Sequence, residues 1–287
     1  MRISLAEMND ISAVRSLWDI CFGDSTDYTD IFFTKMYQSA RTVVARIEAE
    51  IIGSLQFFPH TMFSQGKPLS AMYIGGVDVF PSHRGKGVAK ELMAYTEEYL
   101  RENGTDVLFL TPVFARIYER MGFKPLSYLS EVSGPMSALS SFSAYSVSFS
   151  PTDCPMKSYE KFIKQFPLSL KRTKETFSQE IFPLSKANCC ASENGYILFT
   201  IKDNLFQGLE CGYKNADALR QILGFIYTNF NEVENFSICV PADGLTRMIL
   251  PETTVMEKRF IHTMAKPLTA QVLTERMENY INMIGWF

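Results

Sequence analysis

Apolar residues change their spacing from segment to segment over the first 130 positions, and these changes predict alternating strands and helices. Between Asp10 and Gly23 they recur every three or four residues, which is the period of one helix face. Apolar runs bounded by polar turns predict strands instead. The predicted strands are Arg2–Leu5, Thr42–Glu48, Ile51–His60, Leu69–Phe80 and Asp106–Thr111. The first two predicted helices run from Asp10 to Gly23 and from a cap at Asp24 or Ser25 to about Tyr37. The next two run from Val88 to the stop at Asn103-Gly104 and from Val113 to Arg120. This order predicts one α/β domain with a mixed sheet.

The second half shows a similar order after a stretch rich in Ser and Ala around residues 130–150. We predict a domain boundary there, with one domain at 1–135 and a second domain plus a C-terminal tail at 150–287. The predicted elements of the second half are a helical region from Met156 to about Glu180, a hairpin of Cys190–Ser192 and Tyr196–Lys202, a strand at Phe206–Cys211, a helix at Ala216–Asn229 and a strand at Phe236–Pro241. The order of elements suggests a duplicated fold as a hypothesis.

Composition limits the classes of protein that fit. The 287 residues are 46% hydrophobic and 21% charged, which is ordinary for globular domains. A formal net charge of −3 argues against a nucleic-acid-binding protein. We see neither an apolar run long enough to span a bilayer nor a secretory signal, so we expect a cytoplasmic protein without a membrane partner. The six cysteines form no C-x-x-C pair, so we expect no metal site.

A glycine-rich basic turn, Arg84-Gly85-Lys86-Gly87, separates a predicted strand from a predicted helix. The first N–H groups of a helix have no partner inside the helix, and the helix dipole adds partial positive charge, so a pyrophosphate can bind there. The turn lacks the Ser or Thr that a Walker A loop has after its Lys, and Lys90 stands where a dinucleotide fingerprint needs a third glycine. The turn therefore predicts a phosphate-binding site of another kind.

Two motifs resemble those of the GNAT superfamily of N-acetyltransferases. Arg84, Gly87 and Ala89, preceded by a Val-x-Val strand, resemble its Arg-x-x-Gly-x-Ala signature for acetyl-coenzyme A, and Ile117–Phe123 resembles its downstream tyrosine-to-Gly-Phe segment. The resemblance covers about residues 1–130. It is closest to the "enhanced intracellular survival" type, which has two tandem GNAT-like domains, the second without a coenzyme site. Members of that type usually add a sterol-carrier-like third domain, for which this chain is too short.

The resemblance implies an N-acetyltransferase that moves the acetyl group of acetyl-coenzyme A directly to a primary amine of a small molecule or peptide. It implies a set of donor-binding residues: Val77, Asp78 and Val79 at the pantetheine arm, Arg84, Gly85, Lys86, Gly87, Val88, Ala89 and Lys90 at the pyrophosphate, and Val113 and Phe114 at the acetyl end. A non-catalytic acyl-coenzyme A-binding regulator and a transferase for a different acyl donor are the alternatives, and the sequence leaves a homo-oligomer open.

Two catalytic residues are also implied by the resemblance. Tyr118 would protonate the departing thiolate, because a phenol keeps its proton at neutral pH. The carboxylate of the terminal Phe287 would accept the proton of the amine, although a docked tail without chemistry is an equal alternative. Asp78 is a weaker candidate base, since alternation along the strand turns its side chain away from the face of Val77 and Val79.

Overall fold

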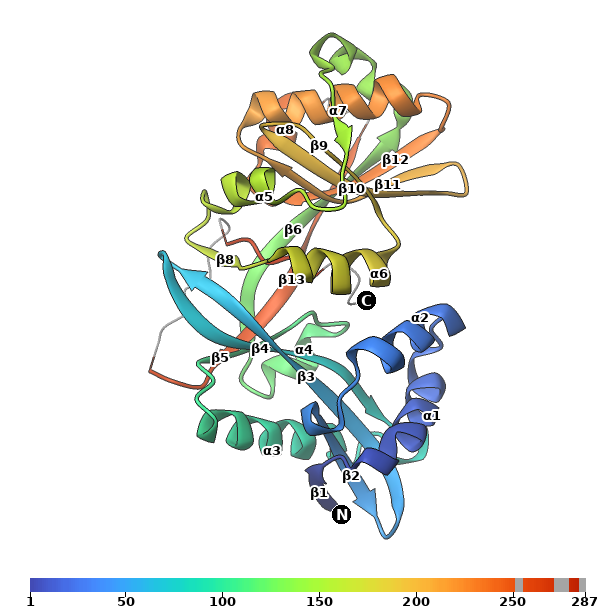
Figure 1. Ribbon diagram of the computed structural model, residues 1–287, viewed down its shortest axis with the longest axis vertical. Helices are drawn as coiled ribbons and strands as arrows, with labels where there is room; N and C mark the ends of the chain where they lie inside the picture. Colours follow the sequence, from blue (N-terminus) through green and yellow to red (C-terminus); the bar gives the residue numbers. More distant parts are fainter. Residues whose placement is uncertain (251–254, 271–278, 284–287) are drawn as a thin grey trace. The chain divides into compact units, whose positions relative to one another are not determined.

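The computed structural model describes residues 1–250, 255–270 and 279–283 (Figure 1). The chain divides into two compact units. Unit 1 consists of Met1–Met62, Pro68–Lys124 and residues 264–270, and unit 2 of Phe63–Lys67, Pro125–Thr263 and residues 279–283, within the described part of the chain. The last long strand, β13 (Met256–Pro267), begins in unit 2 and ends in unit 1.

Unit 1 is built on a mixed sheet with the strand order β1-β2-β3-β4-β5-β13. Its strands are β1 (Arg2–Leu5), β2 (Thr42–Ile47), β3 (Glu50–Ser64), β4 (Lys67–Val79), β5 (Val107–Leu110) and the end of β13. The pairs β1–β2, β2–β3 and β5–β13 are antiparallel, whereas β4 and β5 are parallel because a helix connects them.

The helices of unit 1 cover both sides of these strands, with α1 and α3 on opposite sides (Figure 1). They are α1 (Ile11–Phe22), α2 (Thr26–Ile31), a following π-helical turn (Phe32–Met36), α3 (Val88–Glu102) and α4 (Ala115–Glu119). Trp18 of α1 is fully buried and stacks on Phe32, with ring centroids 4.5 Å apart. Burial of such large rings stabilises this side of the sheet.

The strands of unit 2 follow one another in the order β13-β6-β12-β11-β10-β9-β7. The strands are β6 (Lys124–Pro135), β7 (Ser150–Pro151), β9 (Asn188–Ala191), β10 (Gly195–Lys202), β11 (Leu205–Tyr213) and β12 (Asn235–Pro241), with a short β8 (Leu168–Leu170) outside this order. Only β11 and β12 form a parallel pair among the pairings described within this sheet. Because α7 connects them, β11-α7-β12 repeats the arrangement β4-α3-β5 of unit 1.

Helices lie on both faces of this second sheet (Figure 1). They are α5 (Met156–Ile163), a π-helical turn (Thr176–Ile181), α6 (Phe182–Ser185), α7 (Ala216–Phe230) and α8 (Leu245–Ile249), and the 3-10 segment Met136–Tyr145 precedes them. The apolar face of α7, with Leu219, Ile222 and Leu223, belongs to one core cluster. A second cluster contains Tyr159 of α5 and Tyr280 of the last described segment.

Most of the elements predicted from periodicity are confirmed, with ends shifted by a few residues. The single helical region from Met156 to about Glu180 was wrong, because α5 ends at Ile163 and strand β8 follows. Pro167 explains the break, since proline lacks the N–H that would continue a helix. Strands β6 and β13 were not predicted at all.

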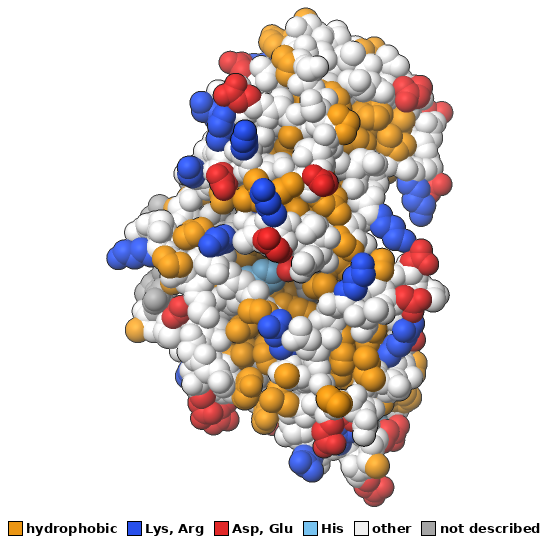
Figure 2. All heavy atoms as spheres, viewed as in Figure 1, with side chains coloured by type: hydrophobic (Ala, Val, Ile, Leu, Met, Phe, Trp, Pro, Cys, Tyr) orange, Lys and Arg blue, Asp and Glu red, His pale blue; other side chains and the backbone are white. Residues whose placement is uncertain are grey.

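Acidic and basic side chains are interspersed on the face drawn in Figure 2, with no stripe of one sign. No helix in the described ranges is both long and apolar enough to cross a membrane. Within the same ranges, no group of three or more His, Cys, Asp and Glu side chains could hold a metal ion.

Candidate active site

Helix α3 begins with an exposed amino terminus directly after β4. The chain leaves β4 through a short 3-10 turn, Pro81–His83, and reaches the helix at Gly87, where φ is +85°. A left-handed residue is needed at this point, which favours glycine. No described side chain caps the helix, and residues 84–87 are exposed. The first N–H groups of α3 are therefore open to an anion.

The side chain of Arg84 holds this turn in shape. Its Nε donates a hydrogen bond to the carbonyl oxygen of Val79 at 3.0 Å, and its Nη2 lies 3.6 Å from the Sγ of Cys21. The thiol of Cys21 also lies 3.5 Å from the same carbonyl oxygen. Arg84 thus fixes the end of β4 relative to the glycine turn, besides adding positive charge beside it.

Strands β4 and β5 pair over a short stretch only. Their described register runs from Ala71 opposite Val107 to Tyr73 opposite Phe109, while β4 continues to Val79. Gly76 bends β4 with a φ of +55°, and a Cβ atom there would lie 1.9 Å from the Oε1 of Gln56. The part of β4 beyond this bend has no described pairing with β5, so its backbone can bond an extended ligand.

Asp78 is buried in this part of β4, with 2% of its surface exposed. Its Oδ1 accepts a hydrogen bond from the backbone N–H of Ser54 at 2.6 Å. Its Oδ2 is buried with no hydrogen-bond partner among the described residues. Burial raises the pKa of this carboxyl to about 7, and the bonds from Ser54 only partly oppose the shift. Val77 and Val79 on either side are half-buried, which agrees with the alternation expected for the strand.

Tyr118 lies on α4, in the loop region that follows β5. Its side chain is half-buried, its ring packs against Phe123 with centroids 6.1 Å apart, and burial raises the pKa of its phenol. Its carbonyl oxygen accepts hydrogen bonds from the N–H groups of Met121 and Phe123, each at 3.0 Å. Val113 and Phe114, which precede α4, are two exposed apolar side chains. The segment therefore presents a protonated phenol beside an apolar surface.

Phe287 lies outside the described residues. The last described segment, residues 279–283, is anchored within unit 2: Asn279 Nδ2 donates to the Leu126 carbonyl at 3.0 Å, and the N–H of Met283 donates to His262 Nε2 at 3.1 Å.

The equivalent helix of unit 2 starts differently. Asn215 is the residue before α7, and its side-chain oxygen accepts a hydrogen bond from the N–H of Ala218 at 3.0 Å. This is an ordinary side-chain cap, and it occupies a group that α3 leaves open. Unit 2 therefore lacks the anion-binding geometry of unit 1 at this position.

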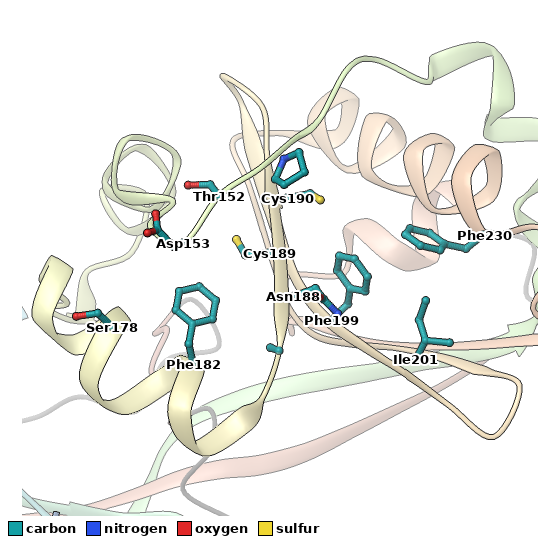
Figure 3. A pocket seen from close by; sticks show the side chains of 12 residues that line it. Thr152, Asp153, Ser178, Phe182, Asn188, Cys189, Cys190, Phe199, Ile201 and Phe230 are labelled. Carbon is teal, nitrogen blue, oxygen red and sulfur yellow. The ribbon is translucent and has the colours of Figure 1, made fainter. Parts of the chain in front are cut away.

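A large hollow in unit 2 has a volume of about 1070 Å³ and lies beside β9 and α6 (Figure 3). Aromatic side chains line much of it, among them Phe182, Phe199 and Phe230. Cys189 and Cys190 point to opposite sides of β9 (Figure 3). Burial raises the pKa of both thiols, which disfavours the thiolate form. None of the candidate site residues that the structure describes lines this hollow.

Residues 2–126 match a family model described as an acetyltransferase (GNAT) domain. A search of curated proteins found no match to the sequence. Among solved structures, a conserved protein of unknown function from Enterococcus faecalis, a probable N-acyltransferase, is 15% identical with a TM-score of 0.76, and the match covers 93% of this chain and 72% of that one. A GCN5-related N-acetyltransferase from Anabaena variabilis is 16% identical with a TM-score of 0.75 and coverages of 93% and 73%. Eis1 from Mycobacterium abscessus is 12% identical with a TM-score of 0.70 and coverages of 93% and 74%.

Identities at this level show a shared fold, and the matches extend over both units. The predicted fold class, tandem GNAT-like domains with a mixed sheet, is therefore confirmed.

Proposed function

We propose, from the premise that residues 2–126 form a domain of the GNAT acetyltransferase family, that this protein transfers the acetyl group of acetyl-coenzyme A to a primary amine. One observation carries the proposal: the amino terminus of α3 is uncapped and follows, after a short turn, a strand whose described pairing with its parallel neighbour ends at Tyr73. That combination offers an anion site next to a stretch of β4 that has no described pairing with β5, as a pyrophosphate joined to a pantetheine arm requires.

The donor would lie along three parts of unit 1. The N–H groups at Gly85–Lys90, with the charge of Lys86, would hold the pyrophosphate. The backbone of Val77–Val79 would bond the amides of pantetheine, as an added strand does. Val113 and Phe114 would cover the acetyl end.

The acetyl group would then pass directly to the amine, without an acyl-enzyme. The amine loses a proton to a base, and its nitrogen attacks the thioester carbon to form the C–N bond. Backbone N–H groups of β4 stabilise the oxyanion while it exists. The C–S bond then breaks, and Tyr118 donates its proton to the coenzyme A thiolate. The phenol of Tyr118, whose pKa burial raises, is protonated at neutral pH, as a proton donor must be.

Two groups are candidates for the base. The carboxylate of Phe287 is the first, and its ordinary pKa of about 3.5 would keep it ionised throughout the neutral range. Asp78 is the second, supported by its unpaired Oδ2 beside the donor strand and by its pKa of about 7. The pH profile of kcat/KM separates the two candidates. If Asp78 is the base, kcat/KM rises with pH through an apparent pKa near 7, and Asp78→Asn removes this rise. If Phe287 is the base, Asp78→Asn removes no such rise.

The test is the release of the coenzyme A thiol across a panel of amines, including aminoglycosides, polyamines and peptide amines. Wild type is compared with Tyr118→Phe, with a chain lacking Phe287, and with Tyr145→Phe as a control, because Tyr145 is an exposed phenol of unit 2. We expect Tyr118→Phe to lower kcat about 10²-fold and the control to leave it unchanged. Full activity in both Tyr118→Phe and the truncated chain would exclude this mechanism.

The same assay distinguishes the alternatives. A regulator would bind acetyl-coenzyme A, as calorimetry can measure, yet release no thiol with any amine. A transferase for another acyl group would show a higher kcat/KM with a longer acyl-coenzyme A than with the acetyl form.

A further inference from the structure

The ammonium group of Lys266 joins two elements of unit 1 that the proposed reaction uses. Its Nζ lies 2.7 Å and 2.6 Å from the two carboxylate oxygens of Glu97 on α3, and 2.8 Å from the carbonyl oxygen of Met121. The side chains of Lys266 and Glu97 are only 26% and 13% exposed. A lysine ammonium has three protons, and these three oxygens can take all of them. An ion pair so shielded from water holds its geometry better than a surface pair.

Lys266 reaches this position from β13, far beyond the part of the sequence that matches the family model. It stands opposite Leu108 in the antiparallel register of β13 with β5. Gly122 leaves room for its side chain, because a Cβ atom there would lie 3.3 Å from the Cε of Lys266. Strand β13 therefore places the ammonium group of Lys266 between α3 and the segment that follows α4.

The segment that Lys266 contacts is continuous with Tyr118. Two hydrogen bonds close a turn from the carbonyl of Tyr118 to the N–H groups of Met121 and Phe123. Phe123 is buried and carries the ring on which Tyr118 packs. Holding the Met121 carbonyl therefore restrains the backbone that carries the phenol.

We propose that Lys266 is a positioning residue for the transfer, which fixes Tyr118 relative to helix α3 through the Glu97 carboxylate and the Met121 carbonyl. This inference rests on the proposed function, in which α3 holds the pyrophosphate and Tyr118 acts at the sulfur of the same donor molecule. Because the pyrophosphate and the sulfur are ends of one ligand, the distance between α3 and Tyr118 decides whether the proton reaches the thiolate. A misplacement of about 1 Å can cost on the order of 10²-fold in rate.

The experiment is a double-mutant cycle of Lys266→Met and Tyr118→Phe, with kcat and KM for acetyl-coenzyme A measured at each corner. Methionine keeps an unbranched apolar chain and removes the ammonium. We expect Lys266→Met to lower kcat about 10-fold, to change KM for the donor less than about 3-fold, and to have no further effect in the Tyr118→Phe background. Lys266→Arg should recover part of the rate, because its cation can still bond both partners.

Lys161→Met is the matched control. The Nζ of Lys161 also bonds a carboxylate and a carbonyl, the Oε1 and backbone oxygen of Glu193, but in unit 2 and at an exposed site. We expect this variant to keep the wild-type kcat. Glu97→Gln provides a milder change should Lys266→Met fold poorly, since it removes the charge pair and leaves the bond to the Met121 carbonyl.

Equal losses of kcat in the wild-type and Tyr118→Phe backgrounds would overturn the proposal, and so would a rise in donor KM at unchanged kcat. A second readout does not depend on activity. With 3-fluorotyrosine incorporated, the ¹⁹F signal assigned to Tyr118 should shift or broaden in Lys266→Met, and an unmoved signal would overturn the positioning role. Absence of thiol release by wild type would instead count against the proposed function.

Discussion

Arg172 and Glu210 form a bidentate ion pair inside unit 2, with Nη1–Oε1 at 2.7 Å and Nη2–Oε2 at 3.0 Å. Their side chains are 2% and 0% exposed. The hydroxyl of Tyr196 donates to the same carboxylate, and Arg172 also donates to the carbonyl oxygen of Asn282. The pair thus links β11 to the last described segment of the chain, from which the undescribed end with Phe287 continues.

Glu210→Gln should be strongly destabilising, because it leaves the Arg172 cation buried without its counter-charge. We expect the free energy of unfolding to fall by about 3–5 kcal/mol, measured by urea denaturation. Glu193→Gln is the control, since it breaks the exposed pair with Lys161 and should cost no more than about 1 kcal/mol. Similar losses in the two variants would contradict the buried pair's role.

Gly87→Ala should weaken donor binding. Alanine in the left-handed conformation that Gly87 adopts costs about 1–2 kcal/mol, so the turn before α3 would change shape. We expect KM for acetyl-coenzyme A to rise at least about 10-fold. Gly104→Ala is a close match, because Gly104 has a φ of +75° with open space around it and lies after the other end of α3. It should lower stability to a similar extent and leave donor KM unchanged.

One molecule of acetyl-coenzyme A should bind per chain, because the Asn215 side chain caps α7 whereas α3 is uncapped. Isothermal titration calorimetry gives the stoichiometry directly. Two sites per chain, or a site that survives Gly87→Ala with unchanged affinity, would contradict the assignment of donor binding to unit 1.

Asp78 should make stability depend on pH. Its pKa is about 7 in the folded protein and near 3.8 in the unfolded chain, so between these values the folded state keeps a proton that the unfolded state has lost. The contribution of Asp78 to stability is therefore fully present below about pH 4 and is lost as the pH rises through about 7.

Asp78→Asn should accordingly stabilise the protein relative to wild type above pH 7, by roughly 4 kcal/mol, with the gain vanishing near pH 4. Urea unfolding at pH 4, 6 and 8 measures it. A constant difference at all three values would mean that the carboxyl is not held protonated. Asp78→Asn also tests whether Asp78 accepts the proton of the amine. A stable Asp78→Asn protein with wild-type kcat excludes Asp78 from that role.

Much of the fold and of the candidate site could be predicted from local sequence patterns. The apolar face of α3, the left-handed Gly87 before it and the cap of α2 at Ser25 each depend on residues within one or two turns of each other. Tyr118 lies 31 positions after Gly87, and the order and spacing of the two motifs carried the family resemblance. The helical region predicted from Met156 shows the limit, because apolar periodicity there did not reveal the strand after Pro167.

The burial of Asp78 was not evident in the sequence. Alternation indicates which way its side chain points, but only the packed sheet shows that Ser54 binds one of its oxygens and leaves the other unpaired. A pKa depends on the surrounding solvent and charges, which the order of residues along β4 does not contain.

The sequence by itself determined where α3 begins and where the glycine turn before it lies, because each of these depends on neighbours along the chain, and it supplied the candidates for the anion site and for the proton donor. Only the tertiary structure decided what holds them together. Lys266 contacts Glu97 and Met121 across a long separation in sequence, through the pairing of β13 with β5. The apolar residues around Phe260–Thr263 could have indicated a strand. The residues near them do not specify which strand β13 pairs with, since strand pairing is decided by which apolar faces pack together in the folded chain.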